Sequence, residues 1–186
     1  MRIGGGRARG TRLRAKGGRG VRPTSTLVSD AVFNSLAPRI AGACVLDLFA
    51  GTGRLGIEAL SRGAREAVFV ERDARNAALI RQNLAAAGLS DRGVVRRADA
   101  LAAAEGERRR FDLIFLDPPY GRGLAAEALR RVAAGTLLAA GGLVIAEGHW
   151  RDDPGEIAGL ARVRTARYGE TAVWVYARAA GREEGA

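Results

Sequence analysis

The chain has 186 residues, 47% hydrophobic and 27% charged, which is the composition of one globular domain with a substantial core. Its apolar runs are short, so no membrane-spanning helix is expected. A single cysteine and a single histidine cannot form an internal disulfide or a closed zinc site. The formal net charge of +10 favours an anionic partner, and nucleic acid is the natural candidate.

Residues 1–22 form a basic, glycine-rich segment. The positive residues before the first acidic residue, Asp30, are Arg2, Arg7, Arg9, Arg12, Arg14, Lys16, Arg19 and Arg22. Because the segment has no sustained hydrophobic period, we expect an irregular arm or a short hairpin outside the core, with a disordered tail as the alternative. It also lacks the apolar stretch of a secretory signal, which predicts a cytoplasmic protein.

The single domain is expected to span residues 23–180, followed by a tail at 181–186. Its first helix is indicated by apolar residues at helical spacing from Val28 to Leu36, and Pro38 should end it. From residue 43, short apolar segments alternate with longer amphipathic ones, which is typical of strand–helix units with a parallel sheet. We expect strands at Val45–Leu48, Ala67–Val70, Val94–Arg97, Leu113–Leu116 and Leu143–Glu147, and helices near 55–62, 74–87, 99–104 and 123–134.

The end of the domain has a different pattern. Ala161–Arg167 and Ala172–Ala177 are separated by a short turn and should close as an antiparallel pair. The predicted fold is therefore α/β and Rossmann-like, with a mixed, mostly parallel seven-stranded sheet, helices on both faces and a C-terminal antiparallel hairpin.

A glycine-rich turn, DLFAGTGRLG at residues 47–56, follows the first strand. Such a turn lets a ligand approach the backbone, and the next helix offers N–H groups. The turn also matches the dinucleotide pattern G-x-G-x-x-G, which alone is a weak signal. A carboxylate at Asp47 can hold an ammonium group but would repel a pyrophosphate. The turn therefore favours S-adenosylmethionine, bound near Asp47, Phe49, Gly51 and Gly53.

Two further acids follow strands at the same predicted edge. Glu71 ends the second strand, where a carboxylate can accept both hydroxyl hydrogens of a ribose. Asp99 follows the third strand and can accept from an adenine amino group, with the Ala100 backbone as a second contact. Alternatively, Asp99 caps a helix that starts at Ala100. Together the acids indicate a nucleoside cofactor.

The tetrapeptide at residues 117–120, which ends the fourth strand, is the most specific signal in the chain. The Asp117 carboxylate and the Pro118 carbonyl form an acceptor pair for an exocyclic amino group, and Pro118 and Pro119 stiffen the turn. Tyr120 would stack on an unpaired or flipped base. The alternative is a proline-stiffened strand end with a surface tyrosine. Glu147, at the end of the fifth strand, is interpreted equally well as a cap or as a site residue.

With these motifs, the chain resembles the bacterial small-subunit ribosomal RNA guanine-N2 methyltransferases over nearly its whole length. The other family-like features are Arg2-Ile3 with its glycines, Arg22-Pro23-Thr24, Phe33-Asn34, Leu55 to Ala64, and Tyr168 to Thr171. The chain departs from the family pattern at Ser25 to Asp30, where it loses two arginines and an aspartate.

The resemblance implies a class I methyltransferase that moves a methyl group from S-adenosylmethionine to the N2 amino group of a guanine in 16S rRNA. It implies a monomer that uses no metal and acts on rRNA, within a small-subunit ribosomal particle. The residues expected to contact RNA are Arg7, Arg9, Arg12, Arg14, Arg22 and Thr24.

Three other functions remain open from the sequence. The tetrapeptide at residues 117–120, DPPY, is shared with amino-methyltransferases that act on adenine or cytosine, so an adenine-N6 methyltransferase on RNA or DNA is one alternative. The changed segment after Thr24 would also suit a noncatalytic RNA-binding or assembly protein. A dehydrogenase is disfavoured by Asp47 and by the lack of a hydride-transfer constellation.

Overall fold

The computed structural model describes residues 1–15 and 24–179. Within these residues, seven strands form one sheet in the order β3-β2-β1-β4-β5-β7-β6. Strands β1 to β5 are parallel, and β7 runs antiparallel to both of its neighbours, β5 and β6. The bounds are β1 (Cys44–Leu48), β2 (Glu66–Val70), β3 (Gly93–Arg96), β4 (Phe111–Leu116), β5 (Leu138–His149), β6 (Leu160–Tyr168) and β7 (Thr171–Arg178). The predicted mixed sheet with its C-terminal antiparallel pair is confirmed.

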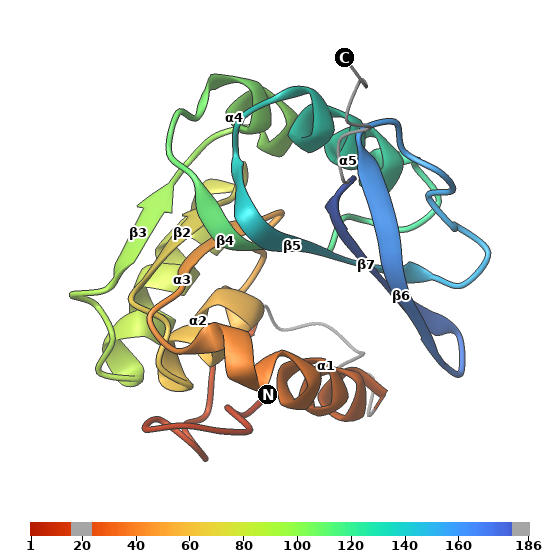
Figure 1. Cartoon of the computed structure of the whole chain (residues 1–186). Helices are drawn as coiled ribbons and strands as arrows, with labels where there is room; N and C mark the ends of the chain where they lie inside the picture. Colours follow the sequence, from red (N-terminus) through yellow and green to blue (C-terminus); the bar gives the residue numbers. More distant parts are fainter. Residues whose placement is uncertain (16–23, 180–186) are drawn as a thin grey trace.

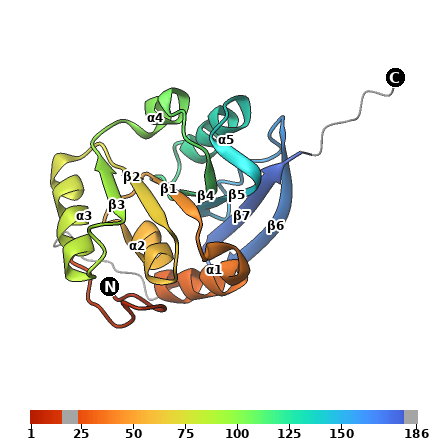
Figure 2. The same cartoon turned by 60° about the vertical axis from the view of Figure 1, so that its left-hand side comes forward.

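Helices cover both faces of this sheet (Figures 1 and 2). One face carries α1 (Thr24–Ile40), α2 (Arg54–Ser61) and α3 (Ala74–Ala86), and the other carries α4 (Ala100–Gly106) and α5 (Leu124–Ala134). Because β1 to β4 run in one direction, the turns that follow them meet at one edge of the sheet. This carboxyl edge is where an open α/β sheet binds its ligands.

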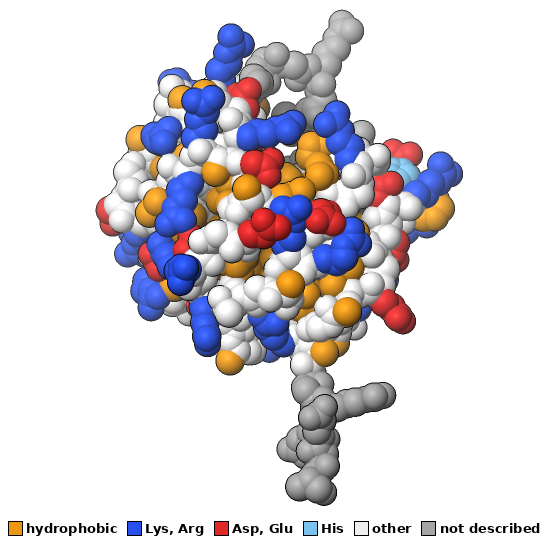
Figure 3. Space-filling view, turned by 90° about the horizontal axis from the view of Figure 1, so that it is seen from above, with side chains coloured by type: hydrophobic (Ala, Val, Ile, Leu, Met, Phe, Trp, Pro, Cys, Tyr) orange, Lys and Arg blue, Asp and Glu red, His pale blue; other side chains and the backbone are white. Residues whose placement is uncertain are grey.

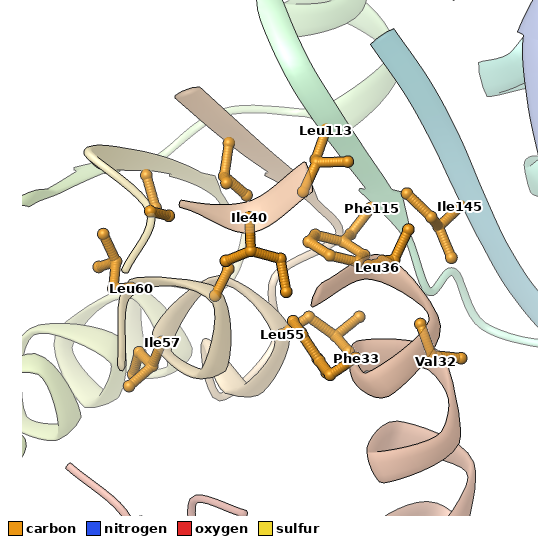
Figure 4. Packing of buried hydrophobic residues seen from close by; sticks show 14 of the residues in the cluster. Val32, Phe33, Leu36, Ile40, Leu55, Ile57, Leu60, Leu113, Phe115 and Ile145 are labelled. Carbon is orange, nitrogen blue, oxygen red and sulfur yellow. The ribbon is translucent and has the colours of Figure 1, made fainter. Parts of the chain in front are cut away.

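The hydrophobic core consists of two clusters, one under each helical layer. Figure 4 shows the cluster in which side chains of α1 and α2 meet those of β4 and β5. Phe33 of α1 and Phe115 of β4 lie with their ring centroids 5.5 Å apart at an interplanar angle of 40°. Both rings are fully buried, so this contact fixes α1 against the centre of the sheet.

Helix α1 does not end at Pro38, contrary to the prediction, but continues to Ile40. Proline removes its own backbone donor, which costs little in a last turn that is held in other ways. Ile40 is only 1% exposed, and the Arg39 Nη1 atom donates to the Gly141 carbonyl at 2.8 Å. Burial of Ile40 therefore carries the helix past the proline.

Strand β5 is also longer than predicted, because it begins at Leu138 and ends at His149. Leu138 pairs with Phe111, and the register with β4 then shifts before Leu143. Gly141 lies within this irregular stretch with φ 72°. The glycines that were expected to precede the strand therefore belong to a bulged part of it.

The N-terminal arm, defined here as residues 1–15, folds back on itself. The Ile3 backbone N–H donates to the Thr11 carbonyl at 3.1 Å, and the Leu13 N–H donates to the Met1 carbonyl at 2.9 Å. Ile3, Ala8 and Leu13 are buried and belong to the core cluster. The prediction that the arm lies outside the core is therefore wrong for these residues, whose spacing matches no helical or strand period.

A buried carboxylate anchors the arm to α2. Glu58 is 2% exposed and accepts backbone N–H groups from Gly4 at 2.8 Å and from Gly5 at 2.9 Å. It also accepts from the Arg62 Nε atom at 2.6 Å. Burying this charge is tolerable because several donors surround it. The remainder of the predicted arm, residues 16–22, lies outside the described residues.

Candidate active site

A cavity of about 720 Å³ opens at the carboxyl edge of the sheet. Predicted site residues from four separate turns line it: Phe49, Gly51, Glu71, Asp99, Ala100, Asp117, Pro118, Pro119 and Tyr120. Asp47 and Gly53 belong to the predicted cofactor set but do not line the cavity. The parallel sheet therefore brings together residues that are up to 71 positions apart, as the separation of Phe49 and Tyr120 shows.

The turn between β1 and α2 has a tightly wound backbone. Phe49 has φ 64°, which is uncommon for a residue with a side chain, and Gly51 and Gly53 have φ 57° and 79°. Such strain persists where the surroundings impose it, often at ligand sites. Gly56 serves packing, because a Cβ atom there would lie 2.3 Å from the Phe69 ring. The G-x-G-x-x-G match is thus explained by turn geometry and by close helix–sheet packing.

Asp47 lies beneath this turn. It is 1% exposed, and its Oδ2 atom accepts the Gly56 N–H at 3.0 Å. Burial raises the pKa of Asp47 to about 7, although the Gly56 hydrogen bond opposes the shift. The structure thus shows Asp47 holding the start of α2 in place, and its contact with a ligand ammonium group stays a prediction.

Glu71 forms one wall of the cavity and is held at both oxygens. Its Oε2 atom accepts the Gly51 N–H and its Oε1 atom accepts the Asp73 N–H, each at 2.8 Å. Each carboxylate oxygen has a further lone pair for a hydroxyl hydrogen. The two backbone contacts fix the side chain, and its contact with a ribose stays a prediction.

Asp99 caps α4 and also lines the cavity. Its Oδ1 atom accepts from the backbone N–H groups of Leu101 at 3.0 Å and Ala102 at 3.1 Å. The capping interpretation is therefore confirmed. It is compatible with the adenine contact, because both Asp99 and Ala100 line the cavity.

Two carboxylates and one arginine meet beside the DPPY turn. Asp117 and Glu147 both line the cavity, and the Arg54 Nη2 atom lies 3.7 Å from the Glu147 Oε2 atom. Burial raises the pKa of Asp117, and Arg54 opposes this shift. Burial, followed by repulsion from Asp117, raises the pKa of Glu147 to about 7. Tyr120, at the rim, is 37% exposed.

The model of a family described as conserved hypothetical protein 95 matches residues 1–177. The chain belongs to this family. Ribosomal RNA small subunit methyltransferase D of Escherichia coli K12 is 37% identical over 147 residues, which cover 79% of this chain and 74% of that protein. The Bacillus subtilis protein YlbH is 37% identical over 181 residues, which cover 95% of this chain and 98% of that protein.

The solved structure of YhhF from Escherichia coli has the same fold. The two structures match with a TM-score of 0.84 at 34% sequence identity, and the match covers 97% of this chain and 99% of the YhhF chain. These matches confirm the resemblance to small-subunit rRNA methyltransferases that the sequence motifs indicated, and with it the class I methyltransferase fold.

The lining of the cavity in this family member suits the chemistry of S-adenosylmethionine. A glycine turn lets a ligand approach the backbone, and the fixed Glu71 carboxylate offers acceptors for the ribose. Asp99 adds a further carboxylate to the lining, while Phe49 and Leu101 supply apolar surface. Within residues 1–15 and 24–179, no cluster of three or more acidic, histidine or cysteine side chains could hold a metal ion.

Arg54 is a site residue that the sequence motifs did not reveal. It is the first residue of α2, directly after Gly53, and it lines the cavity. A positive charge at a helix N-terminus interacts unfavourably with the helix dipole. An arginine at this position in the sequence therefore indicates that negative side chains lie nearby. Two carboxylates in the cavity, Asp117 and Glu147, supply the compensating charge.

The predicted RNA-binding residues lie apart from the cavity lining or outside the described part. Arg7, Arg9, Arg12 and Arg14 are exposed on the arm. Met1 reaches the cavity, so the arm runs beside the site. Arg22 lies outside the described residues. Thr24 is the first residue of α1, but its side chain is not described.

Among the helices that are described, none is long and apolar enough to cross a membrane.

Proposed function

We propose that this protein transfers a methyl group from S-adenosylmethionine to the exocyclic N2 amino group of a guanine in 16S rRNA. The observation that carries the proposal is the DPPY turn on the wall of the cavity that the glycine turn and Glu71 also line. Family membership and the rRNA methyltransferases among the relatives support the reaction and its RNA substrate.

The chain would hold the cofactor through residues of three turns. Glu71 would accept the ribose hydroxyl hydrogens, and Asp99 with Ala100 would contact the adenine. The backbone around Gly51 and Gly53 would cradle the methionine portion near Asp47. When bound, S-adenosylmethionine supplies an electrophilic methyl group and departs as S-adenosylhomocysteine.

The DPPY turn would orient the amino group of the base. The Asp117 carboxylate and the Pro118 carbonyl would each accept one N–H, which would turn the nitrogen lone pair toward the sulfonium methyl group of the cofactor. The amine loses one proton when its new bond to carbon forms, and the Asp117 carboxylate is placed to take that proton. Its raised pKa favours proton acceptance.

Tyr120 would stack on the target base, which must be unpaired or flipped out to reach the turn. Around the site, arginines would bind the phosphates of the RNA. Figure 3 shows positive side chains spread over one face of the molecule, with hydrophobic and acidic side chains between them. The formal net charge of +10 supports the same role. Arg7, Arg9, Arg12, Arg14, Arg22 and Thr24 belong to this proposed RNA surface.

We further propose that the protein acts as a monomer in the cytoplasm on a small-subunit ribosomal particle. The test measures labelled methyl transfer into unmodified small subunits and, separately, into naked 16S rRNA, followed by nucleoside analysis. N2-methylguanosine is expected, with more product from particles. N6-methyladenosine would instead identify an adenine enzyme, and absence of product despite cofactor binding would identify a noncatalytic RNA-binding protein.

A further inference from the structure

A second cavity, of about 230 Å³, adjoins the cofactor cavity. The residues that line both are Pro118, Pro119, Tyr120, Leu124 and Glu147. Its outer wall includes the loop at Asp152 to Pro154, and the Asp152 Oδ2 atom accepts the Gly121 N–H at 2.8 Å. Pro118, Pro119 and Tyr120 of the DPPY turn thus border both cavities, whereas Asp117 lines only the larger one.

Glu147 occupies the boundary between the two cavities. Leu116 of β4 pairs with Ala146 of β5, so Asp117 and Glu147 are the next residues on two adjacent parallel strands. The Glu147 side chain is 12% exposed and lies 3.7 Å from the Arg54 guanidinium. A third acceptor therefore stands beside the pair formed by Asp117 and Pro118.

Three acceptors in this arrangement would suit guanine better than the other bases that carry an amino group. In guanine, the N1–H donor is adjacent to the N2 amino group, so three hydrogens point from one edge. In adenine and cytosine, the ring nitrogen adjacent to the amino group is an acceptor, which an ionised carboxylate would repel. We propose that Glu147 is a specificity-determining residue, which accepts the N1–H of guanine while Asp117 and Pro118 accept the N2 hydrogens. This inference rests on the proposed function.

Arg54 has a positioning role in this arrangement. The groups facing Glu147 are Asp117, which repels its charge, and Arg54, which attracts it. The Arg54 guanidinium orients the carboxylate and favours its ionised form, against the burial and the repulsion from Asp117 that raise the pKa of Glu147 to about 7. A protonated Glu147 could donate to an adenine N1 atom, so the charged form is the one that discriminates.

The test uses base analogues at the methylated position, after that position has been mapped with the wild-type protein. Synthetic rRNA carrying guanine, 2-aminopurine or 7-deazaguanine at this position is assembled into particles. 2-Aminopurine keeps the 2-amino group but has an acceptor at N1, whereas 7-deazaguanine keeps both donors. The wild-type kcat/KM is expected to fall about 10- to 100-fold with 2-aminopurine and to change little with 7-deazaguanine.

The variant Glu147→Gln should lose this discrimination, because an amide can accept from N1–H or donate to an N1 acceptor. The ratio of kcat/KM between guanine and 2-aminopurine should fall to within about threefold of one. Glu170→Gln, at an exposed position in the turn between β6 and β7, is the charge-matched control and should keep the wild-type ratio.

Two results would overturn the inference, and neither depends on the other. Wild-type protein that methylates 2-aminopurine as fast as guanine would show that N1–H is not recognised, whether or not the variant folds. A Glu147→Gln variant that keeps the wild-type ratio would leave Glu147 a purely structural partner of Arg54. If no wild-type reaction yields N2-methylguanosine, the proposed function fails and the inference falls with it.

Discussion

The acceptor pair at the end of β4 depends on one side chain, that of Asp117. In Asp117→Asn the shape is kept, but the charge is lost and an NH2 donor can point at the amino group of the base. We predict a fall in kcat of about 10²- to 10³-fold, similar to the effect of removing one preorganised hydrogen-bonding group at a developing charge. Cofactor affinity, measured by calorimetry, should change less than about threefold. Asp91→Asn is a matched exposed control, and a kcat within about threefold of the wild type would contradict the acceptor-pair mechanism.

Single residues show where sequence reasoning reached its limit. The position of Asp47 at a strand end was predictable, because an apolar run stops at a glycine turn. The direction of its side chain was not predictable, because strand alternation places it under α2, where it accepts the Gly56 N–H. The proximity of Arg54 to Glu147, which lie 93 positions apart in the sequence, follows from the order of β1, β4 and β5. No local pattern encodes that order.

At the scale of elements, the arm is the part whose role the structure changes most. Deleting it would remove Ile3, Ala8 and Leu13 from the core, so weaker RNA binding after deletion would not separate charge from folding. Its arginines also differ among themselves. The four that are predicted to bind RNA are all exposed, but Arg7 donates to the Gly88 carbonyl at 3.0 Å and Arg14 donates to Gln82 at 3.2 Å. Within the described residues, the side chains of Arg9 and Arg12 make no such bond. Substitution is therefore a sharper test than truncation.

We predict that the double variant Arg9→Gln and Arg12→Gln binds rRNA with a weaker dependence on salt. Removing one arginine–phosphate ion pair should reduce the slope of log affinity against log salt by about 0.7 to 0.9. The measurement is RNA affinity at several salt concentrations, with the melting temperature as a check on folding. The control is the double variant Arg108→Gln and Arg110→Gln. Both positions are exposed and directly precede β4, at the end of that strand opposite the cavity. Equal slopes for the two double variants would make the arm a structural element only.

Element boundaries were predicted within one or two residues wherever a turn residue coincides with the end of an apolar segment, as at Leu48 and at Val70. They were wrong where tertiary contacts override a local signal. Burial of Ile40 carries α1 through Pro38, and pairing of Leu138 with Phe111 extends β5 across its glycines. Both contacts are long-range, so local propensity could not reveal them.

For the whole molecule, the concentration of buried acids at one sheet edge determines how stability responds to pH. Burial raises the pKa of Asp47 and of Glu147 to about 7 and also raises that of Asp117. Arginine contacts lower the pKa of other acids, such as Glu127. Stability from a lowered pKa is lost only as the pH falls below the unfolded value, about 4.5, so it is constant at neutral pH.

A raised pKa has the opposite effect in a higher range. The folded state binds protons that the unfolded state has already released, so the stability that these acids contribute is fully present below about pH 4 and is lost as the pH rises through about 7. We predict that the cofactor-free protein melts at a higher temperature at about pH 6 than at about pH 8. About 1 kcal/mol for each of two carboxylates corresponds to a difference of about 4 °C or more. Asp47→Asn, whose amide oxygen can still accept the Gly56 N–H, should melt higher at the upper pH and vary less between the two pH values. A wild-type melting temperature that is equal or higher at the upper pH would show that these acids do not resist ionisation in the fold.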